Sequence, residues 1–93
     1  MQYTDMYEAD AYRRLCARRR ELPQSWSNAQ VLESLERLVA QREETYMVPI
    51  PRHGRDQIDS ACYGRACVQA ERKVLNDIRA HLALSAISQE VSA

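Results

Sequence analysis

The chain has 93 residues, and its 13 basic and 13 acidic side chains give a formal net charge of zero. A chain of this length forms one domain, or one subunit of an oligomer, with a modest core. Two Gly and three Pro argue against an all-β fold, and the balanced charge argues against a protein that binds nucleic acid mainly through its phosphates. We therefore expect a single, mostly helical domain over residues 1–93.

Three cysteines, Cys16, Cys62 and Cys67, are an odd number for a disulfide framework. Neither a signal peptide nor an apolar stretch long enough to span a membrane accompanies them. We expect reduced thiols in a cytoplasmic protein that does not insert into a membrane.

The first helix is expected over residues 5–22, because Asp5 and Glu8 give it an acidic start and Pro23 ends it. Its polar side carries a run of arginines, of which Arg19 and Arg20 have no acidic residue at helical spacing. The spacing predicts an apolar face that consists of Ala11, Tyr12, Leu15 and Cys16.

The second helix is expected over residues 28–46. Ser27 and Gln30 form a capping box, and Trp26 can pack on Val31 as a hydrophobic staple. The predicted apolar stripe consists of Val31, Leu32, Leu35, Leu38 and Val39. Acidic residues collect on one flank of this helix, namely Glu33, Glu36, Glu43 and Glu44.

Residues 47–55 contain two prolines and a glycine, which predicts a connecting loop. Asp56 is expected to cap a long third helix over residues 56–88, after which the tail should fray. Gly64 in the middle of this helix suggests that another backbone approaches closely. The apolar and small residues predicted to face the core are Ala61, Gly64, Val68, Val74, Leu75, Ile78 and Leu82.

Arg65, Arg72 and Arg79 repeat at intervals of seven and form a row along the third helix, which we call the arginine row. None of the three has an acidic residue three or four positions away, so we expect the row to await a partner. The alternative for Arg65 and Arg72 is pairing with Glu36 and Glu43 of the second helix. Arg79 is expected to lie beyond the second helix and to stay unpaired.

The third helix should be longer than the second, so part of it extends past its neighbour. Two architectures follow. The first is a three-helix bundle, and the second is a helical hairpin with a long C-terminal helix plus the N-terminal helix, dimeric through residues 82–87 of the third helix.

The sequence assembles no catalytic or cofactor motif, so we expect a protein that is not an enzyme and needs no cofactor. Cys62 and Cys67 within one helix lack the spacing of common zinc sites, and we assign no metal. Arg52, His53 and Arg55 could hold an anion at the start of the third helix, although a solvated turn explains them as well.

A charge-balanced helical chain with arginine and tyrosine faces indicates a protein-binding module that occupies or blocks a surface of a larger partner. Phage- and plasmid-encoded inhibitors of host defence, anti-CRISPR proteins among them, are often of this general character, although no motif links the sequence to a family. The alternatives are a nucleic-acid-binding regulator that uses the first helix, and an anion or nucleotide binder built from Arg52, Arg55 and Arg79 at an oligomer interface. The residues expected to bind a partner are Arg18, Arg19, Arg20, Arg65, Arg72, Lys73, Arg79, Tyr3 and Tyr7.

Overall fold

The computed structural model describes residues 2–92, and for residues 84–92 it describes the helical backbone alone. This part of the chain forms three helices and no strand: α1 (Met6–Glu21), α2 (Asn28–Tyr46) and α3 (Arg55–Ser92). The predicted all-α class is therefore confirmed. The first two helices end within about one residue of their predicted bounds.

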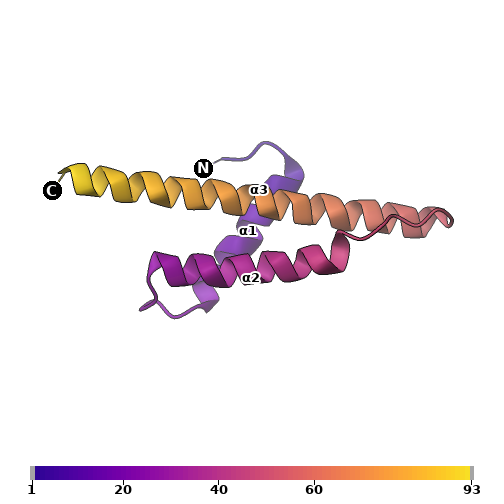
Figure 1. Ribbon diagram of the computed structural model, residues 1–93. Coiled ribbons are helices and arrows are strands. Elements are labelled where there is room, and N and C mark those ends of the chain that lie inside the picture. The colour runs from indigo at the N-terminus through magenta and orange to yellow at the C-terminus, as the bar shows by residue number, and fades with distance from the viewer. Residues whose placement is uncertain (1, 93) are drawn as a thin grey trace.

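The helices are arranged around α3, which is the longest element (Figure 1). Its 38 residues, at about 1.5 Å each, account for the longest dimension of the molecule, 59 Å. In Figure 1, α2 lies antiparallel beside the middle of α3, while α1 crosses both obliquely. The three-helix arrangement is confirmed. The dimer remains a prediction, and of the residues 82–87 proposed for it, the side chains from Leu84 onward lie outside the described part.

Local signals fix the helix ends. The side chain of Asp5 accepts a hydrogen bond from the Glu8 backbone N–H, and Ser27 and Gln30 form the predicted capping box at the start of α2. The third helix differs from the prediction at both ends. Its backbone is helical as far as Ser92, beyond the expected end at residue 88, and it begins at Arg55, directly after Gly54 with its φ of +86°. Asp56 therefore lies inside the first turn, where its charge still suits the helix dipole.

The core is formed by one side of each helix. Its spacing of three and four residues agrees with the predicted apolar faces. Leu75, Val74 and Val39 are fully buried, and large aliphatic side chains of this kind contribute about 1.5–3 kcal/mol each. The buried cluster consists of Ala11, Leu15, Val31, Leu35, Val39, Ala70, Val74 and Leu75.

Gly64 is approached by a side chain and not, as the sequence suggested, by another backbone. A Cβ atom at this position would lie 2.8 Å from Cδ1 of Tyr46, the last residue of α2. The missing side chain thus leaves room for the Tyr46 ring to lie against α3. The guanidinium of Arg42 is 5.6 Å from the centre of the same ring, which is a cation–π distance.

One acidic side chain is buried where the three helices meet, and the sequence analysis did not identify it. Glu71 of α3 carries a carboxylate, yet it is only 1% exposed and lies among the core residues Val68, Val74 and Leu75. Its Oε1 accepts a hydrogen bond of 2.7 Å from Nε of Arg42 in α2 and one of 3.3 Å from Nη2 of Arg14 in α1. A single carboxylate oxygen therefore ties α3 to both other helices.

Candidate partner-binding surface

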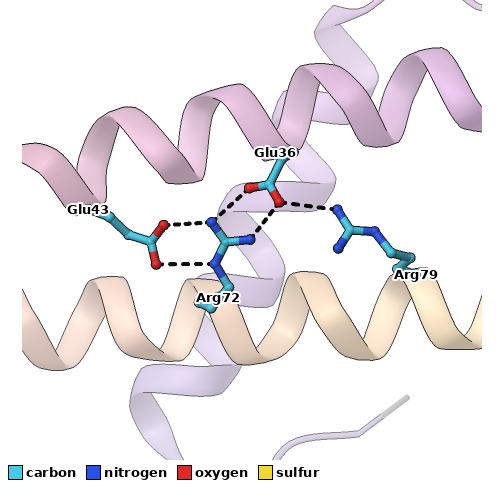
Figure 2. Close-up of polar contacts among 4 residues, drawn as sticks. All are labelled: Glu36, Glu43, Arg72 and Arg79. Atoms are coloured by element: carbon cyan, nitrogen blue, oxygen red, sulfur yellow. Dashed lines mark hydrogen bonds and ion pairs between the residues drawn. The ribbon is translucent and has the colours of Figure 1, made fainter.

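Two members of the arginine row are paired inside the molecule, which corrects the expectation that the row is unpaired. Arg72 donates from Nε and Nη2 to the two carboxylate oxygens of Glu43, at 3.1 and 2.6 Å. It also donates from Nη1 to Oε1 of Glu36 at 2.8 Å, and Arg79 reaches the same oxygen at 3.4 Å (Figure 2). The prediction that Arg79 stays unpaired is wrong. Glu36 and Glu43 are seven residues apart, as are the arginines, so the two rows match across the antiparallel pair.

Arg65 is the member of the row for which the structure gives no ion pair among the described residues. The pairing of Arg72 with Glu36 and Glu43 sets the register, which places Arg65 beside the end of α2. This helix ends at Tyr46, so no carboxylate follows at the required position. The proposed pairing of Arg65 within the hairpin is therefore not formed.

Replacing Arg72 by Gln is expected to lower the free energy of unfolding at pH 7 by about 1–2 kcal/mol, because hydrogen bonds to charged groups are among the stronger ones. The Arg72 guanidinium holds the pKa of Glu36 below its ordinary value of 4.5, while burial opposes this shift in part. Because the pKa of Glu36 is lower in the folded state, its ionised carboxylate stabilises the fold above about pH 4.5, and this stabilisation is lost as the pH falls through the lowered pKa. The difference in stability between variant and wild type should therefore shrink on acidification.

Urea denaturation at a series of pH values checks this expectation. Arg37→Gln is the control, since Arg37 is paired with Glu33 on the outer face of α2 and 78% of its side chain is exposed. Its effect should stay below about 0.5 kcal/mol. A difference for Arg72→Gln that does not change with pH would contradict the role of Glu36.

Tyr3, Tyr7 and Lys73 also have partners within the molecule. The Tyr3 hydroxyl donates to Oδ2 of Asp77 at 3.0 Å, and burial together with this carboxylate raises the pKa of Tyr3 to about 12. Lys73 forms an ion pair of 2.7 Å with Glu8, and the Tyr7 ring meets Tyr63 edge-on at 5.8 Å. These three side chains hold α1 and the N-terminal segment against α3.

The arginines at the end of α1 divide into two groups. Arg18 pairs with Glu21 at 2.9 Å, although both side chains are exposed and the pair contributes little. Arg19 and Arg20 are exposed and have no ion pair among the described residues. They remain available for a partner.

A groove lies beside Arg19 and Arg20, and its lining, as far as the side chains are described, has no acidic residue; we call it the basic groove. Its inner hollow, of about 280 Å³, opens between the three helices, and a second hollow adjoins it beside the turn from α1 to α2. Cys16 and Arg19 line both hollows. In the inner hollow, a hydrogen bond to the Cys16 thiol raises the pKa of Tyr12. The inner lining is Tyr12, Leu15, Cys16, Arg19, Asn28, Val31, Leu32, Leu35, Ile78, His81 and Leu82. The outer lining is Cys16, Arg19, Arg20, Leu22, Pro23, Gln24, Trp26, Asn28 and Val31.

Exposed apolar side chains gather at the opposite end of α2. Tyr46, Met47, Val48 and Ile50 are each between 38% and 45% exposed, and we call this segment, residues 46–50, the apolar loop. Most exposed apolar residues on a protein surface occur singly, so four within five residues are unusual. The sequence showed the loop but not how far its apolar side chains stay in water.

Arg52, His53 and Arg55, the candidate anion site, are exposed at the start of α3 and form no ion pair among the described residues. The side chain of Gln57 lies over Gly54, since its Oε1 would be 2.9 Å from a Cβ built there. A neutral acceptor therefore already occupies part of the space at this helix start. Anion binding here stays a prediction.

No cluster of metal-ligand side chains is found among the described residues, where Cys62 is exposed, Cys67 buried and Cys16 half-buried, each as a free thiol. Within the same part of the chain, no helix has the length and apolar character needed to cross a membrane. Comparisons of the chain with protein-family models, curated proteins and solved structures found no match.

Proposed function

We propose that this chain is a small non-enzymatic protein-binding module that acts in the cytoplasm by occupying or blocking a surface of a larger partner, as a phage- or plasmid-type inhibitor of host defence would. The observation that supports the proposal is the apolar loop, whose four large side chains remain 38–45% exposed. Beside it lie His53 and two arginines, Arg52 and Arg55, that form no ion pair with the described residues. Met, Tyr and Arg are enriched at protein interfaces, and exposed apolar clusters mark interaction sites.

The backbone of the apolar loop suits a contact with a folded protein. Pro49 and Pro51 restrict the backbone of the loop and keep the residues before them, Val48 and Ile50, out of helical geometry, so less conformational freedom is lost on binding. The backbone N–H groups of Val48, Ile50 and Arg52 form no hydrogen bond with the described residues, whereas Pro49 and Pro51 have no N–H to donate. The loop thus presents backbone donors beside its apolar side chains, and a partner's carbonyl groups can bind them.

The test is affinity purification of the tagged chain from its native cytoplasm, with the double variant Val48→Asp/Ile50→Asp beside the wild type. Both side chains lie outside the buried core, so the variant should keep its helical circular dichroism. We expect a protein partner to be recovered with the wild type and to be lost with the variant, because two carboxylates would have to be desolvated in the contact.

Met6→Asp is the matched control, since Met6 is 69% exposed and lies at the start of α1, outside the loop. The control should retain the partner. Recovery of nucleic acid in place of protein, with an affinity that falls steeply as salt rises, would overturn the proposal in favour of the nucleic-acid-binding alternative. A partner retained equally by wild type and loop variant would exclude the loop as its contact.

A further inference from the structure

We propose that the basic groove binds an acidic amphipathic helix of a partner protein. This is a second contact surface, at the other end of α2 from the apolar loop, and it does not depend on the loop. Helices α1, α2 and α3 each contribute apolar side chains to the inner hollow, among them Leu15, Leu32 and Ile78. An apolar hollow that three helices line can take the apolar face of a fourth helix, as the core of a four-helix bundle does.

The charge of the groove sets the chemistry of its occupant. Among the residues whose side chains the structure describes, neither hollow has an Asp or Glu in its lining, although the chain as a whole contains as many acidic as basic residues. Arg19 lines both hollows and Arg20 the outer one, and neither has an ion pair among the described residues. Glutamates flanking the apolar side of a bound helix would meet these guanidinium groups, whereas lysines there would be repelled.

The size of the inner hollow fits side chains from one face of a helix. About 280 Å³ is close to the lower end of the volumes found for ligand pockets, which is enough for a few aliphatic side chains. Leucines at positions i, i+3, i+4 and i+7 lie on one face and would enter the hollow together. Trp26, the single Trp of the chain, lines the outer hollow and reports on its occupancy.

The experiment titrates the full chain with two synthetic helical peptides and follows Trp26 fluorescence. Both peptides carry four leucines at this spacing and no aromatic residue, one with Glu and the other with Lys on the flanks. We expect the acidic peptide to give a saturable change in Trp26 emission and the basic peptide to bind at least about tenfold more weakly. Arg19→Glu/Arg20→Glu should reverse this preference.

Arg13→Glu serves as the control for charge, because Arg13 lies on the same helix, is exposed and pairs with Asp10 away from the groove. It should keep the preference of the wild type. Val48→Asp/Ile50→Asp should keep it as well, so failure of the loop proposal and failure of the groove proposal are distinguishable.

Three outcomes would overturn the inference. Equal binding of both peptides would show that charge does not select the occupant. A preference unchanged by Arg19→Glu/Arg20→Glu would place the peptide elsewhere. A Trp26 emission that changes with protein concentration alone, together with a doubled mass in light scattering, would assign the groove to a second copy of the chain.

Discussion

Replacing Arg14 and Arg42 together by Met is expected to lower the free energy of unfolding by about 3–5 kcal/mol, the range measured when a buried charge loses its partners. Met retains the aliphatic length of each side chain, so the change removes mainly the two guanidinium groups. Glu71 would then be a buried carboxylate without the two donors that the structure shows on its Oε1. The arginines are themselves partly exposed, at 41% and 34% of their side chains, so their own desolvation offsets little of this loss.

Adding Glu71→Leu to the double variant should recover most of the lost stability, because an apolar side chain of similar size would replace the unpaired charge. Urea denaturation followed by circular dichroism measures all three proteins. Arg13→Met is the control, since Arg13 forms only an exposed pair with Asp10, and it should change stability by less than about 0.5 kcal/mol. A double variant as stable as the control would mean that Glu71 does not depend on the pairs.

The sequence predicted what is decided locally. The capping box at Ser27 and the acidic start at Asp5 depend on residues three positions apart, and both are found as expected. The core faces follow from helical spacing in the same way. Arg79 was misjudged because its environment depends on how α2 and α3 are aligned, which no local spacing determines. The pairing with Glu36 and Glu43, which the sequence offers as an alternative for Arg65 and Arg72, is formed by Arg72 and Arg79.

The burial of Glu71 was not predicted from the sequence, for a different reason. It occupies a core position between Val68 and Leu75, and an acidic residue in an apolar stripe is itself a signal of a buried pair. The partners could not be named, because Arg14 and Arg42 come from two other helices and their convergence depends on the crossing of α1. The basic groove was missed for the same reason, although Arg19 and Arg20 were identified as unpaired from their spacing alone.

Leu75→Ala is expected to cost about 2–5 kcal/mol, because Leu75 is fully buried in the cluster shared by the three helices and its truncation leaves a cavity. This is a large part of the roughly 5–15 kcal/mol by which domains are stable, so the variant should unfold at a clearly lower urea concentration. Met6→Ala, at an exposed position, is the control and should lie within about 0.5 kcal/mol of the wild type.

Hydrogen exchange distinguishes this loss of global stability from a local change in α3. Residues 67–75 contain the buried residues of α3 within the range whose side chains are described, and their amides should exchange faster in Leu75→Ala because they open with the whole fold. Residues 55–60 form the first turns of α3 and are mostly exposed. Their amides exchange through local opening, so their exchange rates should change little between wild type and Leu75→Ala. A uniform acceleration along all of α3 would mean that the helix behaves as one cooperative unit. In that case the apolar loop beside its first turns would be as stable as the core, and its exposed side chains would be held in place before any partner arrives.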